Sequence, residues 1–286
     1  MKKRKEEIPF SFYFRGMTRV KSQISALLRK LRLLFVADKI RYRLQKKNFN
    51  KENRVFRLQN PGLALPPDFS IYETYTLNLR EYYNDGLSTA KEIVYRIQKH
   101  RDMLRDGRIL DWGCGPGRIV RHLPVLLPET EIYGTDYNQE YIDWCQRKLD
   151  NIKFSVNHID PPTNYLDSFF DAVIGVSIFT HLSEASHMAW MNELYRITKP
   201  AGIIFITTQG VAYRSKLTAA ERSHFDKGYL VTRRYISEGN RLFSTFQPPE
   251  FIKRIVADRF EIVEFFAGIT NDNEPAQDQW VLRKSG

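Results

Sequence analysis

The chain has 286 residues, 42% of them hydrophobic, which is enough for one large domain with a sizeable core. No apolar run approaches the ~20 residues of a membrane-spanning helix, and the basic start lacks the small-residue cleavage site of a signal peptide. The two cysteines, Cys114 and Cys145, have no metal-type spacing and favour a reducing, cytoplasmic compartment.

The net charge of +11 is unevenly spread along the chain. Residues 1–60 hold 18 Lys+Arg against 4 Asp+Glu, whereas the other 226 residues hold 26 against 29. The basic character therefore belongs to the N-terminal segment, and the body of the protein is near neutral. Nucleic acid is accordingly not the favoured partner of that body.

Residues 1–70 are predicted to form a basic helical extension and a linker. Between Met17 and Leu34 the apolar residues recur at alternating spacings of three and four, which predicts an amphipathic helix over 17–35. That helix either packs on its own domain or a second subunit, or lies on an anionic membrane surface or nucleic acid. Residues 45–70 read as a linker, because charged residues give way to "NPG" and "PP" turn signals.

Residues 71–107 are predicted to form a helical segment, which Gly86 breaks into two helices. Its tyrosines either line a pocket or pack in the core. They are Tyr72, Tyr75, Tyr82 and Tyr83.

From residue 108 onward, strand-like and helix-like segments alternate, which predicts a doubly wound, mostly parallel α/β sheet. A short helix over 118–123 is expected to end at Pro124. A polar insertion is predicted over 210–247, and a helix and an antiparallel pair of strands complete the chain to residue 286.

The stretch "LDWGCGPGR" at 110–118 joins the first predicted strand to the helix predicted after it. Glycines there let a ligand approach the backbone, and the start of that helix offers unpaired N–H groups. A dinucleotide fingerprint needs a small residue where Arg118 stands, and a P-loop needs a G-K-[ST] that is absent. Asp111 at the strand end would repel a pyrophosphate but suits a ligand with an ammonium group.

This stretch resembles motif I of the class I S-adenosylmethionine-dependent methyltransferases, and the resemblance extends over about 180 residues. The matching segments, in order, are "GTD", "FSVNHIDPP", "SFFDAVIGVSIFTHL", "ITKPAGIIFITT" and "QDQWVLRK". The resemblance implies a seven-stranded sheet with an antiparallel final strand, S-adenosylmethionine as cofactor and methyl transfer as the reaction. It also implies that residues 71–107 form a helical lid, that residues 108–209 form the donor-binding half and that the 210–247 insertion lies on the acceptor side. Parts of the match are similar to a subgroup associated with glycan assembly, which favours a polar small-molecule or glycan acceptor.

The resemblance also implies the residues of the donor site. They are Asp111, Gly113, Cys114, Gly115, Arg118, Asp136, Tyr137, Asn157, His158 and Ser177. Asp136 would bind the ribose hydroxyls or cap the next helix. Asn157 and His158 would contact the adenine, unless Asn157 makes a local turn and His158 is simply a surface residue.

His181, just past the fourth strand, is the candidate general base, since its pKa range suits that role. The alternative is a histidine that bonds to the backbone. Three other functions stay open: an RNA methyltransferase with residues 1–60 as a basic arm, a catalytically silent donor-binding partner subunit, and a nicotinamide dehydrogenase.

Overall fold

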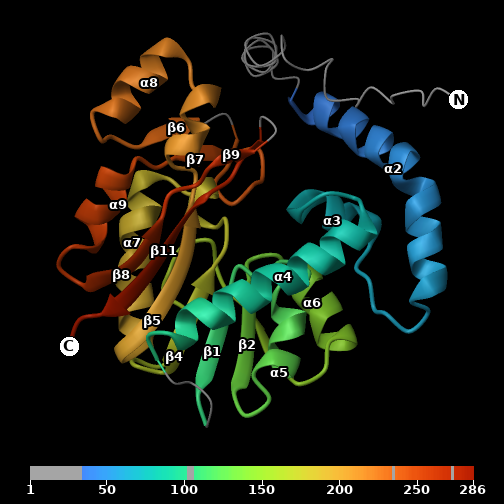
Figure 1. Cartoon of the computed structure of the whole chain (residues 1–286), viewed down its shortest axis with the longest axis horizontal. Coiled ribbons are helices and arrows are strands. Elements are labelled where there is room, and N and C mark those ends of the chain that lie inside the picture. The colour runs from blue at the N-terminus through green and yellow to red at the C-terminus, as the bar shows by residue number, and fades with distance from the viewer. Residues whose placement is uncertain (1–33, 102–105, 234–235, 272–273) are drawn as a thin grey trace, which may run out of the picture.

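The computed structural model describes residues 34–101, 106–233, 236–271 and 274–286. At its centre is a seven-stranded sheet of order β3-β2-β1-β4-β5-β11-β8 (Figure 1). Its strands are β1 (Arg108–Trp112), β2 (Glu131–Asp136), β3 (Ile152–Val156), β4 (Phe170–Gly175), β5 (Thr198–Thr208), β8 (Phe260–Phe266) and β11 (Asp278–Lys284). Strand β11 runs antiparallel between β5 and β8. The predicted doubly wound sheet with an antiparallel final strand is confirmed.

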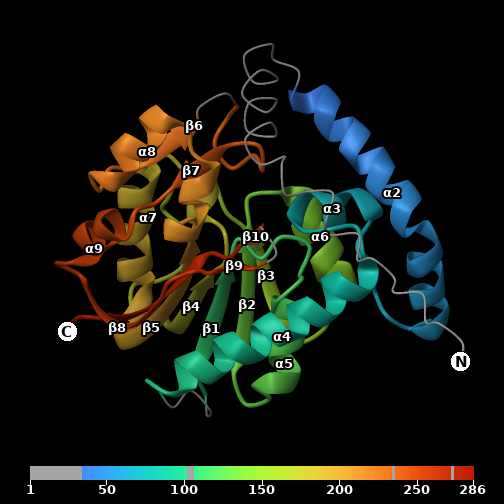
Figure 2. The ribbon, with the colours of Figure 1, turned by 45° about the horizontal axis from the view of Figure 1, so that its top comes forward.

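Helices cover both faces of this sheet (Figure 2). The helices are α2 (Leu34–Gln59), α3 (Asp68–Thr74), α4 (Leu79–Gln98), α5 (Leu123–Leu126), α6 (Gln139–Lys148), α7 (Glu184–Ile197), α8 (Ala219–Asp226) and α9 (Pro249–Val256). Three 3₁₀ turns are η2 (Val120–His122), η3 (Phe179–His181) and η4 (Val211–Lys216). Two small hairpins pair β6 (Val231–Arg233) with β7 (Ser244–Phe246), and β9 (Thr270–Asn271) with β10 (Glu274–Pro275).

The strand alternation explains the two cores, because successive side chains point to opposite faces of the sheet. Ile109 of β1 packs with helices α4, α5 and α6 on one face. Its neighbour Leu110 packs with α7 and α9 on the other face. This arrangement leaves the carboxyl ends of the parallel strands free to form a site.

Helix α2 replaces most of the linker that the sequence predicts over 45–70. It continues to Gln59 because its inner face has partners: Phe56 is buried in a cluster with Ile71, Leu77 and Tyr82. That cluster joins α2, α3 and α4. The predicted domain boundary at residue 70 falls inside α3, and the helix predicted over 17–35 lies almost entirely outside the described residues.

Two breaks predicted from single residues are wrong. Pro124 lies in the first turn of α5, where its missing N–H costs nothing, so it begins a helix instead of ending one. Gly86 lies inside the continuous helix α4, at a point where the backbone of Arg118 comes close to the helix. A Cβ built on Gly86 would lie 2.4 Å from the backbone oxygen of Arg118.

Gly86→Ala should therefore lower the free energy of unfolding by about 2 kcal/mol, the usual cost of overpacking less the better helix propensity of alanine. Thermal or denaturant unfolding measures the change. Gly62→Ala is the matched control, since a Cβ there meets nothing within 4 Å. Equal stabilities of the two variants would show that α4 does not need this close approach.

Candidate functional site

The glycine-rich loop after β1 forms one wall of the site. Gly113, Gly115 and Gly117 have φ of +72°, +54° and +79°, which favour glycine. The amides of Gly113 and Cys114 donate to the Thr135 carbonyl at 2.7 and 2.9 Å, which ties the loop to β2. A Cβ on Gly113 would lie 2.0 Å from Cδ1 of Ile178, so the loop also approaches the segment after β4.

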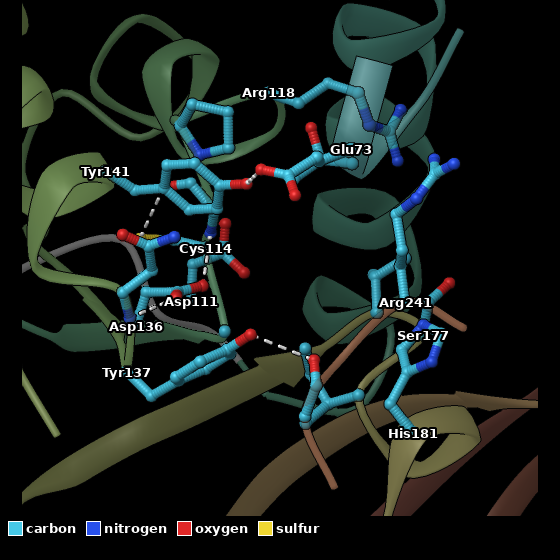
Figure 3. Close-up of a pocket in the computed structure, with 18 of the residues that line it drawn as sticks. Glu73, Asp111, Cys114, Arg118, Asp136, Tyr137, Tyr141, Ser177, His181 and Arg241 are labelled. Carbon is cyan, nitrogen blue, oxygen red and sulfur yellow. Dashed lines mark hydrogen bonds between the residues drawn. The ribbon is translucent and has the colours of Figure 1, made fainter. Parts of the chain in front are cut away.

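Two adjoining cavities lie at this edge of the sheet, of about 190 and 70 Å³. Charged and polar groups from β1, β2, α3 and the 239–241 loop line the larger cavity, and tryptophan and aliphatic side chains dominate the lining of the smaller one. Both cavities share one set of residues, which are Gly113, Asp136, Tyr137, Ile178, His181 and Gly239. In Figure 3, Asp111 and Asp136 face His181 and Arg241 across the larger cavity.

Asp111 is the least satisfied polar group of the site. Its side chain is 2% exposed, and its Oδ2 atom has no hydrogen-bond partner among the described residues. Burial raises the pKa of this carboxyl to about 7, although the charge of Arg118 opposes the shift. A buried carboxylate oxygen without a partner beside a cavity is a binding position for a cationic ligand group.

Asp136 lies at the end of β2 and is held by two backbone amides. Gly115 donates to its Oδ2 at 2.9 Å, and Asn138 donates to its Oδ1 at 2.8 Å. Burial still raises the pKa of the Asp136 carboxyl to about 6. The cap of α6 is Asn138, whose side chain accepts from the Glu140 amide, so the alternative role of Asp136 as that cap is wrong.

His181 belongs to η3, directly after β4, and lines both cavities. Its Nδ1 lies 2.8 Å from the Phe243 carbonyl oxygen, so Nδ1 carries the hydrogen that the carbonyl accepts. This bond leaves Nε2 unprotonated in the neutral ring. Burial lowers the pKa of the imidazole, which favours that neutral form. The histidine thus bonds to the backbone and borders the cavity at the same time.

The other predicted donor residues are distributed unevenly around the cavities. Cys114, Arg118 and Ser177 line the larger one, and Asn157 lines the smaller one. Burial raises the pKa of the Cys114 thiol well above its usual value, which agrees with a packing role. His158 is exposed and belongs to the lining of neither cavity, which is the surface position that the sequence left open as the alternative to an adenine contact. The side-chain amide of Asn157 donates to the His158 carbonyl.

Ser177 has a strained backbone for a residue with a side chain, with φ at +65°. Its amide donates to Oγ1 of Thr207 at 2.8 Å, and its hydroxyl donates to Gln277 at 2.9 Å. These bonds, one to β5 and one to the residue just before β11, hold the segment after β4 in place. The segment that carries His181 is therefore fixed at two points.

Several residues that line the larger cavity carry no sequence signal that distinguishes them. Glu73 of α3 accepts a hydrogen bond from Tyr141 of α6 at 2.7 Å, which joins two helices beside the cavity. Arg241, from the insertion after β5, donates to the Tyr72 carbonyl at 2.9 Å and pairs with Asp38 of α2. The 239–241 loop of this insertion lines the larger cavity.

The tyrosines of residues 72–83 pack instead of lining the cavities. Tyr72 and Tyr82 are 1% and 0% exposed, and Tyr82 donates to the Pro116 carbonyl. Tyr75 donates to Asp85 and lies under the Arg118 guanidinium, 4.5 Å from the ring centroid. The packing alternative left open by the sequence is the one observed.

The fold is a Rossmann-like α/β sheet with a polar cavity at the carboxyl ends of its parallel strands, the edge at which such sheets bind ligands. Residues 109–202 match the family model described as a methyltransferase domain. The chain thus contains a methyltransferase domain, and its fold is the one found in S-adenosylmethionine-dependent methyltransferases.

Similar proteins agree with the match to a methyltransferase domain. The chain is 33% identical over 108 residues to an uncharacterized methyltransferase of Schizosaccharomyces pombe, covering 34% of this chain and 38% of that protein. It is 27% identical to malonyl-[acyl-carrier protein] O-methyltransferase of Bacillus cytotoxicus, covering 58% and 57%. It thus spans less than two thirds of either relative. A solved SAM-dependent methyltransferase of Methanosarcina mazei shares the fold, with a TM-score of 0.52 and 20% identity over 66% of this chain and 97% of that one.

Proposed function

We propose that the protein transfers a methyl group from S-adenosylmethionine to a polar small molecule or glycan acceptor. The observation that carries this proposal is the buried Asp111 carboxylate, with its unpartnered oxygen at the larger cavity. A zwitterionic methionine group would supply the missing ammonium. The protein is accordingly expected to bind the donor in the absence of an acceptor.

The residues around the cavities fit the parts of the donor. Arg118 lines the larger cavity and suits the donor carboxylate, while Asp111 suits the ammonium. Asp136 suits the ribose hydroxyls, since it lines both cavities and a carboxylate can accept hydrogen bonds from hydroxyl groups. The smaller cavity, which includes Trp112, Trp190 and Asn157, offers apolar surface and one amide to the adenine.

The bound donor would supply an electrophilic methyl group on its sulfonium sulfur. The protein must hold the acceptor in line with that methyl group and exclude water, and positioning of this kind contributes several kcal/mol to lowering the barrier. If the acceptor is a hydroxyl, we expect Nε2 of His181 to take its proton, since the bond of Nδ1 to the Phe243 carbonyl leaves Nε2 unprotonated. The relative from Bacillus cytotoxicus is an O-methyltransferase, which supports oxygen as the methylated atom.

Two measurements test the proposal in sequence. Calorimetric titration should show S-adenosylhomocysteine binding, and NAD binding without it would contradict the proposal. Release of S-adenosylhomocysteine should then be followed with saccharides, small carboxylates and an RNA oligonucleotide as acceptors. Turnover with RNA alone would identify an RNA methyltransferase, and donor binding without any turnover would favour the silent partner subunit.

Asp136→Ala should weaken S-adenosylhomocysteine binding by about 1–3 kcal/mol, the cost of leaving hydrogen bonds to a charged group unmade. The measurement is calorimetric titration, with thermal unfolding to confirm that the variant is folded. Asp150→Ala is the matched control, because Asp150 is exposed and outside both cavity linings. An unchanged affinity in folded Asp136→Ala would remove the ribose assignment.

A further inference from the structure

The inner face of helix α2 packs against α3, α4 and the segment between them. Phe56 is 4% exposed in the cluster with α3 and α4. Asn53 and Gln45 bond to the backbone of residues 77–79, and the Tyr42 ring contacts the Tyr72 ring at 5.1 Å between centroids. These residues recur at spacings of three and four, so they lie on one side of the helix. The opposite side faces away from the fold (Figures 1 and 2).

That outer side carries large aliphatic side chains in contact with solvent. Val36, Ile40 and Leu44 are four residues apart and are 54%, 51% and 55% exposed. Val55 and Leu58, at 41% and 72% exposed, continue the same side toward the end of the helix. Single exposed aliphatic residues are common on protein surfaces, but these five lie together along one side of the helix.

Cations lie among and beside these aliphatic residues. Helix α2 has eight basic residues against two acidic ones, a net charge of +6. Lys46 and Arg57 pair with Asp68, and Asp38 pairs with Arg241. Six further cations are exposed and form no ion pair within the described parts of the chain. They are Lys39, Arg41, Arg43, Lys47, Lys51 and Arg54.

We propose that the outer face of α2 docks on an anionic lipid surface. Anionic headgroups attract the cations, and the acyl boundary accepts the aliphatic groups between them, while the long basic side chains extend their charges to the headgroups. A nucleic acid would match the cations but would offer little to Ile40, Leu44 or Leu58. A second copy of α2 would bring two faces of the same charge together.

The sequence before α2 adds to this attraction through its charge alone. Residues 1–33 contain ten Lys+Arg against two Glu. No described helix is long and apolar enough to cross a bilayer, so the contact proposed is with the surface. The opposite side of α2 bonds through Asp38 to Arg241, which lines the donor cavity, so docking would bring that cavity close to the lipid headgroups.

Sedimentation of the full chain with vesicles tests the proposal. At 100 mM salt the protein should bind vesicles of 3:1 phosphatidylcholine and phosphatidylglycerol and should not bind pure phosphatidylcholine. The paired substitutions Lys47→Glu with Lys51→Glu, and separately Ile40→Asn with Leu44→Asn, should each weaken binding about tenfold or more. The control pair Lys91→Glu with Lys227→Glu makes the same charge change on α4 and after α8, and should alter binding less than threefold.

Thermal unfolding and S-adenosylhomocysteine titration confirm that each variant is folded, and neither readout depends on the proposed acceptor. Equal vesicle binding by all the variants would overturn the proposal. It would also be overturned if the protein bound an RNA duplex in preference to the vesicles, with no loss in the Ile40→Asn, Leu44→Asn variant. A loss of dimers with that variant in light scattering, without any vesicle binding, would assign the face to a second copy instead.

Discussion

Asp111→Asn is expected to weaken S-adenosylhomocysteine binding about 100-fold and to raise the melting temperature of the ligand-free protein. The two effects have opposite signs because one carboxylate causes both. Its unpartnered, buried oxygen destabilises the empty fold, and the same oxygen attracts the donor ammonium. Asparagine keeps the shape and removes the charge. Calorimetric titration and thermal unfolding measure the two effects.

The sign of the pH dependence follows from the raised pKa of Asp111, about 7. An acid with a raised folded-state pKa destabilises the fold as pH rises from its unfolded value, near 4, to its folded value. The ligand-free wild type should therefore lose stability over that window, and the Asp111→Asn variant should lose less. Donor affinity should rise up to about pH 7, because the ionised carboxylate is the form that pairs with the ammonium.

Asp278→Asn is the matched control. Asp278 is also fully buried, has an unpartnered Oδ2 atom and a pKa raised to about 6, but it lies outside the lining of both cavities. It should share the gain in stability and leave donor affinity unchanged. Equal donor affinity in wild type and in both variants would remove the ammonium assignment.

His181→Ala should reduce the rate of methyl transfer to a hydroxyl acceptor 10²–10⁴-fold, the usual contribution of general-base catalysis. The affinity for S-adenosylhomocysteine should change little by comparison. The lowered pKa of His181 means that the wild-type rate falls only when acid protonates the imidazole, at a pH below the usual value for histidine. The rate of S-adenosylhomocysteine release, measured from pH 5 to 9 for the wild type and the variant, shows the loss of rate and its dependence on pH.

His158→Ala is the control for this experiment, since His158 is exposed and outside both cavity linings. It should match the wild type in rate and donor affinity. If His181→Ala kept the wild-type rate across the pH range, the role of His181 would be reduced to its bond with the Phe243 carbonyl. Weakened donor binding in His158→Ala would restore the adenine contact that the sequence suggests.

The fold was largely predictable because its signals are local. The strands and their order of appearance follow from short apolar segments between turns, and the glycine-rich loop follows from three glycines in five residues. The errors concern residues whose effect depends on a neighbour distant in the chain. Gly86 stands inside helix α4 because the backbone of Arg118 leaves no room for a side chain at that position. Residues 45–59 are helical because Phe56 and Asn53 contact residues of α3, α4 and the segment between them.

The candidate site divides in the same way. Asp111, Asp136 and His181 each lie at or just after the end of a strand, so their position at one edge of the sheet could be inferred from the order of elements. Glu73, Tyr141 and Arg241 come from α3, α6 and the insertion, and no local pattern marks them. His158 is only one residue beyond Asn157, but the direction of the chain there takes it out of the lining.

The sequence by itself determined the class of this protein, because the glycine-rich loop and the acids at the strand ends depend on backbone conformation and element order. Only the tertiary structure decided which helices close the site and what α2 presents to its surroundings. Those features depend on contacts between residues up to about 200 positions apart, such as the pair of Asp38 with Arg241. Contacts of that kind leave no periodicity in the sequence, and they become visible only when the packed cores bring the elements together.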